Sequence, residues 1–382
     1  MALNSLCLSV NRTMAGVARY QLGLLQGLAA IPSGDEILAL CSEGGKQLVP
    51  TCDMITKSVC LGMKDSVVKR CLWEHLLSPL RLNKLHVDLL HSTNFLTPFY
   101  VPCASVVTMH DLTYLSHGHL HLSARRAYHL ALIGWSARRS QRIIAVSENT
   151  RKEIISRLNV PPQKVVAIYP GICTKQFRPV IDGAAARTLE EKYGLRRKQY
   201  VLYVGGVHPR KNVVTLVKAY KLLEKFGRLE DLVICGPRLF GNGELIAELE
   251  RPGGGGRIIS TGPMPDPELP ALYSNAALMV YPSLYEGFGY PVVEAMACGT
   301  PVITSNVSSL PEAAGTAAIL VDPLDVENLA QNMARVLSDT SLQNRLVADG
   351  KRHVRRFSLE GAARETLKVY GEALEFWRKD RK

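Results

Sequence analysis

Long apolar runs are missing from this chain, and so are the cysteine patterns that mark several common classes of protein. No stretch approaches about 18 consecutive apolar residues, so we expect no transmembrane helix. The first residues lack a basic segment followed by a long apolar one, unlike a secretory signal. The nine cysteines are an odd number without a C-x-x-C pair. This disfavours a disulfide framework or a zinc site and predicts reduced thiols in a cytosolic protein.

Aromatic residues are scarce, at 7%, while the net charge is +12. Such a surplus suits nucleic acid, an anionic membrane surface or a phosphorylated substrate. No nucleic-acid-binding signature accompanies the charge, so nucleic acid is the least favoured partner. A G-x-G-x-x-G turn with a downstream acid is absent as well, which disfavours a nicotinamide-dependent enzyme.

The length of 382 residues exceeds one ordinary domain, and 47% hydrophobic with 21% charged residues is the balance of a folded protein. Runs rich in valine and isoleucine alternate with amphipathic stretches, which predicts parallel sheets with helices on both faces. A charged, irregular stretch between two such series is interpreted as a linker. We therefore predict an α/β chain of two doubly wound, Rossmann-like domains, at residues 1–175 and 198–356, with a linker at 176–197 and a terminal helix at 357–382.

The pattern also predicts individual elements. Strands are expected at residues 5–10, 36–41, 87–92, 103–111, 142–147, 165–171, 200–206, 231–236, 256–262, 277–283 and 301–306. Helices are expected at residues 16–30, 147–159 (with Ser147 as the N-cap), 212–227, 243–250, 269–276 and 291–299. In such sheets ligands bind beyond the carboxyl ends of the strands, so candidate residues should follow strands directly.

One such segment, "YPSLYEGFGYPVVEAMACGTPVITSN", places two glutamates around a glycine turn. Pro291 suits the first turn of a helix, and Gly299 suits its end. The backbone N–H groups of Phe288, Gly289 and Tyr290 would then form a helix N-terminus that favours anions such as phosphate. Glu286 and Glu294 would suit the hydroxyl groups of a sugar and of a ribose. The spacing is equally compatible with a solvated Glu286 and with a Glu294 that only complements the helix dipole.

The pattern E-G-F-G-x-P-x-x-E-A-M-A-C-G-x-P-V resembles the retaining glycosyltransferases of family four, which have the GT-B fold. The similarity covers nearly the whole chain, through "GVARY", "HSTNFLTP", "MHDLTYL", "AVSENTRKEII", "YPGICTKQFRP", "LYVGGVHPRKN" and "TGPMPDPELPALYSNA". It implies that Glu286 contacts the donor sugar, that Gly287 lies in the same loop, and that Glu294 binds the ribose. It also implies an N-terminal domain on the acceptor side, a C-terminal domain for the nucleotide sugar, and a terminal helix that crosses back to the first domain.

"VGGVHPRKN" places Arg210 and Lys211 between a strand and a helix. Two cations there would neutralise a diphosphate leaving group without metal, although an isolated pair is also compatible with a solvated basic turn. Many relatives carry arginine where this chain has Gly206, so the resemblance favours Lys211 over Arg210 as the essential cation.

Further candidates follow other strands. The resemblance implies that His110, in "TMHDL", lies close to the transferred sugar, although a lone histidine there is also compatible with a hydrogen-bonded strand end. Asp111 fits an orienting or, slightly better, a structural role. Gly16 resembles the glycine that approaches the donor phosphates, where close backbone approach is needed, and Arg19 is a weaker candidate that packs this loop.

"TGPMPDPE" resembles the loop over the nucleobase and implies a backbone contact near Met264. Asp266 and Glu268 form a D-x-E that would suit a divalent metal, but the flanking prolines favour a turn that enters a helix. We therefore expect no metal and no cofactor beyond the donor substrate.

Together these features predict a hexosyltransferase that retains anomeric configuration and uses a nucleotide diphosphate sugar. "HSTNF", "MHDLTYL" and "PRKN" look most like bacterial mannosyltransferases of surface polysaccharide assembly, which implies GDP-mannose as donor and a glycan or lipid-linked acceptor. A nucleotide-sugar epimerase of GT-B fold and a catalytically silent binding subunit remain alternatives.

Residues 121–142, with Arg125, Arg126, Arg138, Arg139 and Arg142, suggest a core-packing helix or a peripheral docking face for anionic lipid at the inner membrane surface.

Overall fold

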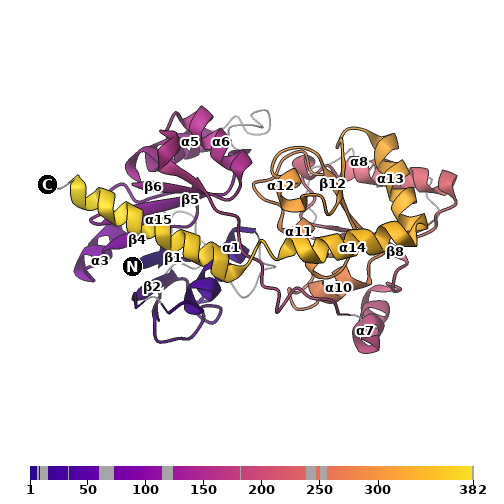
Figure 1. The fold of residues 1–382 in the computed structure, drawn as a ribbon, viewed down its shortest axis with the longest axis horizontal. Coiled ribbons are helices and arrows are strands. Elements are labelled where there is room, and N and C mark those ends of the chain that lie inside the picture. The colour runs from indigo at the N-terminus through magenta and orange to yellow at the C-terminus, as the bar shows by residue number, and fades with distance from the viewer. Residues whose placement is uncertain are drawn as a thin grey trace. The chain divides into compact units, whose positions relative to one another are not determined.

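The structure is a computed structural model. It describes residues 1–6, 8, 16–32, 34–59, 73–113, 124–180, 182–237, 247–249 and 256–380, without the side chains of 58–59 and 124–130. The chain forms two compact units (Figure 1). Unit 1 comprises Met1–Gly171 and Phe357–Lys382, and unit 2 comprises Ile172–Arg356. Each contains a parallel sheet, so the predicted two-domain α/β architecture is confirmed.

The sheet of unit 1 has the strand order β3-β2-β1-β4-β5-β6-β7. Its strands are β1 (Ala2–Asn4), β2 (Ile37–Cys41), β3 (Ile55–Val59), β4 (Leu89–Ser92), β5 (Ala104–Met109), β6 (Arg142–Ala145) and β7 (Val165–Ala167). Ala2 pairs with Leu38 on one side and with Leu90 on the other, both in parallel register. The strand order therefore reverses between β1 and β4, where sheets of this type bind ligands.

The helices of unit 1 are α1 (Gly16–Ala29), the π-helix η1 (Trp73–Leu77), α3 (Ser78–Lys84), α5 (Ala124–Arg139), α6 (Glu148–Leu158), the 3₁₀ turn η3 (Pro162–Lys164) and α15 (Leu359–Lys379). Figure 1 shows α15, in yellow, beside α1 and the strands β4 to β6. Val369, Tyr370 and Ala373 of α15 join the same buried cluster as Leu89 and Val106. The terminal helix therefore completes the core of unit 1, as predicted.

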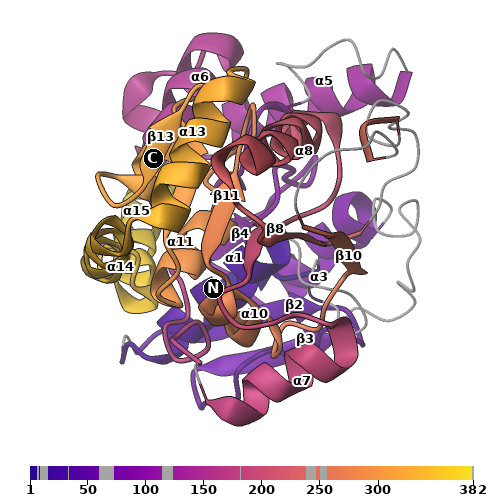
Figure 2. The ribbon, with the colours of Figure 1, turned by 90° about the vertical axis from the view of Figure 1, so that its right-hand side faces the viewer.

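Unit 2 has the strand order β10-β9-β8-β11-β12-β13. These strands are β8 (Tyr200–Val204), β9 (Asp231–Cys235), β10 (Ile258–Gly262), β11 (Leu278–Tyr281), β12 (Val302–Ser305) and β13 (Ile319–Val321). The helices are α7 (Gly183–Tyr193), α8 (Val213–Leu222), α10 (Leu269–Asn275), α11 (Tyr290–Ala297), α12 (Leu310–Ala314), α13 (Val326–Ser338) and α14 (Thr340–Val354), with 3₁₀ turns η4 (Pro209–Lys211) and η5 (Leu223–Phe226). Helix α8 packs with α13, and α11 packs with α10 and α14 (Figure 2). Helix α11 also packs with α12.

The structure differs from the sequence prediction mainly at the boundaries. Unit 1 ends at Gly171 rather than at 175, and the predicted linker at 176–197 is part of unit 2. Its helix α7 is capped by Asp182, which accepts from the backbone N of Ala185 at 2.7 Å. Most of this helix is exposed, so its charged sequence resembled a linker.

Two predicted elements fall partly outside the described residues. The strand expected at 5–10 is found at Ala2–Asn4, where the chain pairs with β2 and β4, and residues 7, 9 and 10 are not described. Of the helix expected at 243–250, the structure describes only 247–249, which are helical. In the part of the chain that is described, no helix is both long and apolar enough to span a bilayer.

Candidate functional site

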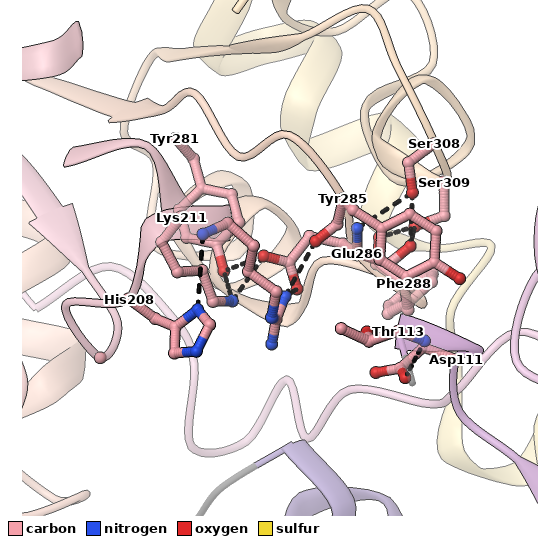
Figure 3. Close-up of polar contacts among 12 residues, drawn as sticks. Asp111, Thr113, His208, Lys211, Tyr281, Tyr285, Glu286, Phe288, Ser308 and Ser309 are labelled. Carbon is pink, nitrogen blue, oxygen red and sulfur yellow. Dashed lines mark hydrogen bonds and ion pairs between the residues drawn. The ribbon is translucent and has the colours of Figure 1, made fainter. Parts of the chain in front are cut away.

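Three charged side chains meet beyond the carboxyl ends of β8 and β11 in unit 2 (Figure 3). Nζ of Lys211 lies 2.5 Å from Oε1 of Glu286, and Nη1 of Arg210 lies 3.0 Å from Oε2 of the same carboxylate. The hydroxyl of Tyr281 donates to Oε1 over 3.0 Å and accepts from Lys211 Nζ at 2.5 Å. Each oxygen of Glu286 therefore has a cationic partner, and the predicted residues Arg210, Lys211 and Glu286 form one cluster.

The loop after β8 is fixed by its own polar side chains. His208 caps η4, because its Nδ1 accepts from the backbone N of Arg210 at 3.4 Å. Asn212 adopts the left-handed conformation, with φ of 56°, and its side-chain amide donates to the carbonyls of Pro282 at 3.1 Å and Pro323 at 2.6 Å. The bond to Pro282 holds the basic turn against the segment that carries Glu286, and the bond to Pro323 holds it against the segment after β13.

Two serines after β12 fix the backbone of Glu286. Ser308 Oγ accepts from the backbone N of Glu286 at 3.0 Å and donates to its carbonyl at 2.6 Å. Ser309 Oγ lies 2.8 Å from the same carbonyl and 3.1 Å from that of Phe288. The sequence motifs did not predict a role for either serine, for Tyr281 or for Asn212. Tyr281 ends β11 and the two serines closely follow β12, on the edge where ligands bind, whereas Asn212 directly precedes α8.

The electrostatics keep Glu286 ionised. Burial alone would raise the pKa of this carboxyl, but Lys211 and Arg210 outweigh it and lower the pKa from 4.5 to about 2. Burial and the charge of Glu286 raise the pKa of Tyr281 well above its ordinary value, so that hydroxyl remains a donor. The cluster therefore presents two cations beside a carboxylate that can only accept hydrogen bonds.

Helix α11 begins and ends where its sequence predicts. Gly289 stands before it with φ of 110°, a conformation that glycine adopts without strain, and Gly299 follows it with φ of 76°. Gly287, Phe288 and Gly289 are buried and Tyr290 is half-buried.

Glu294 lies inside α11 and is only 2% exposed. Its Oε2 accepts from the hydroxyl of Tyr273 on α10 at 2.9 Å. The carboxylate is therefore held in place by a neighbouring hydroxyl. Glu286 is buried as well, so the alternative of a solvated Glu286 is wrong, whereas a dipole role for Glu294 is not tested by its burial. A ribose contact remains a prediction.

The other residues predicted in unit 2 follow β10. Met264 is buried just after β10. Asp266 and Glu268 lie in the turn before α10, and Glu268 binds Lys192 Nζ at 2.7 Å and the hydroxyl of Tyr193 at 2.9 Å. The D-x-E is thus a helix-entry turn, as predicted, and its glutamate joins α7 to α10. Among the described residues, no three His, Cys, Asp or Glu side chains converge in a way that would hold a metal ion.

His110 follows β5 in unit 1 and is half-buried. Its Nε2 lies 2.8 Å from the carbonyl O of Thr93, and its ring packs edge-on against Tyr20 and Phe95, with centroids 5.0 and 5.6 Å away. Burial lowers the pKa of His110 more than the Thr93 carbonyl and Asp111 raise it. The ring is therefore neutral near pH 7. Because a carbonyl can only accept, Nε2 carries the proton and Nδ1 is left as an acceptor.

A chain of buried hydrogen bonds runs behind His110. The hydroxyl of Tyr370 on α15 lies 2.7 Å from Nδ1 of His91, whose Nε2 lies 2.7 Å from Oγ1 of Thr108. Thr108 in turn lies 2.9 Å from the hydroxyl of Tyr20, the ring that packs against His110. The terminal helix is thus connected to the predicted site residue through side chains that sequence analysis did not single out.

Gly16 and Asp111 complete the predicted set. Gly16 is the exposed first residue of α1, and residues 9–15 before it lie outside the described part of the chain, so the predicted glycine loop stays a prediction. Oδ1 of Asp111 accepts from the backbone N of Thr113 at 3.0 Å, which supports its structural role (Figure 3).

Both halves of the chain are similar to known glycosyltransferases. The model of "Glycosyltransferase Family 4" matches residues 14–176, and that of "Glycosyl transferases group 1" matches residues 186–353. Over 281 residues the chain is 35% identical to O-antigen chain mannosyltransferase B of Escherichia coli, covering 73% of each protein. It is 31% identical over 283 residues to the serotype-specific mannosyltransferase WbdA of Escherichia coli, covering 72% of this chain and 34% of WbdA. Sucrose-phosphate synthase from Thermosynechococcus elongatus has the same fold, with a TM-score of 0.74 at 22% identity over 97% of this chain and 98% of that one.

Two Rossmann-like units and a terminal helix that returns to the first make up the GT-B fold. The two family models identify the chain as a glycosyltransferase of this fold. The chain belongs to glycosyltransferase family 4. The fold and family implied by the sequence motifs are therefore confirmed.

Proposed function

We propose that this glycosyltransferase transfers mannose from GDP-mannose to a hydroxyl of a glycan or lipid-linked acceptor, with retention of anomeric configuration. The reaction type is carried by one observation, the cluster in which Arg210 and Lys211 flank the ionised Glu286. The choice of sugar is supported by the similarity to two mannosyltransferases.

In this proposal the two cations receive the negative charge of the departing nucleoside diphosphate. Charge-assisted hydrogen bonds from Arg210 and Lys211 stabilise that charge where water is excluded. The backbone N–H groups at the start of α11, from Gly287 to Tyr290, add donors and the positive end of the helix dipole. Glu286 holds both cations in position and accepts hydrogen bonds from hydroxyls of the transferred sugar. No metal enters this scheme.

The remaining candidates recognise the other parts of the substrates. Glu294 accepts from the ribose hydroxyls, and the backbone near Met264 contacts the base. In unit 1, Gly16 permits close approach of the donor phosphates, and the acceptor nitrogen Nδ1 of His110 binds a sugar hydroxyl. The acceptor hydroxyl attacks the face from which the diphosphate leaves, and the departing phosphate oxygen takes its proton.

A panel of donors tests this function. GDP-mannose should raise the melting temperature more than UDP-glucose or UDP-mannose at equal concentration, since a tighter ligand stabilises more by mass action. With acceptor present, mannose should be transferred and the product should keep the donor's anomeric configuration by NMR. A larger rise in melting temperature with a uridine donor would reject GDP-mannose as the donor. Conversion of the donor sugar without any acceptor would instead favour an epimerase. Loss of activity in EDTA that manganese restores would reject the metal-free scheme.

A further inference from the structure

Three leucines on one short helical segment of unit 1 are exposed, and so is a fourth leucine directly after it. The segment consists of η1 and α3, and α3 is labelled in Figure 1. It packs against the sheet through Trp73 and Leu82. We call its exposed leucines Leu76, Leu77 and Leu80, together with Leu85 directly after α3, the leucine face; they are 61%, 55%, 70% and 47% exposed. Large apolar side chains grouped in this way on a surface are typical of interaction sites.

Aromatic side chains extend this surface. The ring of Phe99 stacks on His75 of η1 with centroids 4.2 Å apart, and it packs edge-on against Trp135 of α5 at 5.4 Å. Phe99 and the neighbouring Tyr100 are both exposed. Amphipathic aromatic rings are enriched at the boundary between lipid and water.

Basic side chains border the apolar surface. Arg81 and Lys84 are exposed on α3. Arg138 and Arg139 are exposed on α5, three and four residues after Trp135 and hence on the same side of that helix. The acid of the segment, Glu74, is buried and accepts from Asn4. Exposed leucines bordered by arginine and lysine are complementary to an anionic lipid surface.

We propose that the leucine face docks unit 1 on a bilayer that contains anionic lipid. The leucines enter the boundary between headgroups and acyl chains, and the four basic residues contact lipid phosphates. This surface differs from the one that the sequence suggested at residues 121–142. There Ile133 and Ala137 are buried in the core, and Arg142 is bound to Glu372 at 3.0 Å. The side chains of Arg125 and Arg126 lie outside the described residues. Arg138 and Arg139 thus supply charge, while the apolar contact comes from η1 and α3.

Vesicle co-sedimentation of the full chain, without donor sugar, tests the proposal. Wild type should bind vesicles of phosphatidylcholine with phosphatidylglycerol, bind poorly to phosphatidylcholine alone, and be released by high salt. The triple variant Leu76→Gln, Leu77→Gln, Leu80→Gln should bind at least about tenfold more weakly, because three apolar side chains are lost from the contact. Arg81→Gln with Lys84→Gln should weaken binding roughly thirtyfold, since each basic residue contributes about fivefold.

Matched controls come from unit 2. Leu229 and Leu324 are exposed at 68% and 72%, so Leu229→Gln with Leu324→Gln changes equally exposed leucines outside the leucine face. Unchanged melting temperatures would show that every variant is folded. Wild-type binding by the triple variant, or an equal loss in the unit 2 control, would overturn the proposal. So would a wild-type dimer in solution that the triple variant makes monomeric without any change in vesicle binding. Because no donor sugar is present, the result is independent of which sugar the enzyme transfers.

Discussion

At the scale of single residues, Glu286 matters because it holds two cations that would otherwise repel each other. The side chain is only 9% exposed, as is expected of a carboxylate whose two oxygens are both paired. A comparable pair lies elsewhere in unit 2, where Lys221 Nζ is 3.5 Å from Oε1 of Glu248 and both side chains are at most 10% exposed. One Lys–Glu pair thus lies in the proposed site and the other does not, which allows stability and catalysis to be separated.

Lys211→Ala should lower turnover about a hundredfold, since the loss of one electrostatic donor to a developing anion costs roughly 3 kcal/mol. Lys221→Ala is the matched control, because it breaks a buried Lys–Glu pair outside the proposed site. Both variants should lose stability in chemical denaturation, but only Lys211→Ala should lose turnover in a steady-state assay. If Lys211→Ala turned over as fast as Lys221→Ala and wild type, Lys211 would have no catalytic role.

The low pKa of Glu286 also predicts how stability depends on pH. A pKa lowered from 4.5 to about 2 on folding means that this carboxylate stabilises the native state above pH 4.5. That stabilisation, at most about 3 kcal/mol, is lost as the pH falls from 4.5 toward 2. The free energy of unfolding should therefore drop more steeply in wild type than in Glu286→Gln over this range. Parallel curves for the two proteins would show that Glu286 is not held ionised by its neighbours.

At the scale of helices and strands, local signals in the sequence located elements better than they located contacts. Ser147 accepts from the backbone N of Thr150 at 3.0 Å, and α6 begins directly after it, as its N-cap pattern predicts. The sequence predicted the end of α11 equally well, because Gly299 follows its C-cap residue. Helix α7 was missed because a mostly exposed, charged helix lacks the apolar periodicity that distinguishes a helix from a linker. The packing of α15 on α1 depends on close approach, which periodicity does not reveal.

Gly27 on α1 and Gly371 on α15 form a natural pair for testing that approach. A Cβ on Gly27 would lie 2.3 Å from the carbonyl O of Leu359, whereas a Cβ on Gly371 would meet nothing within 4 Å. Gly27→Ala should therefore destabilise the chain by about 1–3 kcal/mol or more through overpacking. Gly371→Ala should stabilise it by about 0.5–1 kcal/mol through helix propensity. Urea denaturation measures both, and a neutral Gly27→Ala would mean that α1 and α15 are not so closely packed.

At the scale of the whole molecule, the sequence predicted the two parallel sheets, because alternation of strands and helices is a property of neighbouring residues. It also predicted Arg210, Lys211 and Glu286, which follow strands in recognisable motifs. It did not predict Tyr281, Ser308 or the chain from Tyr370 to Tyr20. Those contacts join residues that are far apart in the chain, and the side chains are common ones that carry no motif of their own.

The position of the cations predicts which of the two units binds the nucleotide. Nucleoside diphosphate alone should bind unit 2, through the basic turn at 209–211 and the start of α11, because these segments hold the cations and the backbone donors. At a hundredfold excess over its dissociation constant, GDP would stabilise the bound region by about 2.7 kcal/mol. Hydrogen exchange should therefore slow in residues 200–216 and 281–297, with little change in β5 and α15 of unit 1. Lys211→Ala should lose this protection, and Lys221→Ala should keep it. If saturating GDP slowed exchange in unit 1 and left residues 281–297 unchanged, the nucleotide site would have to be reassigned to the first unit.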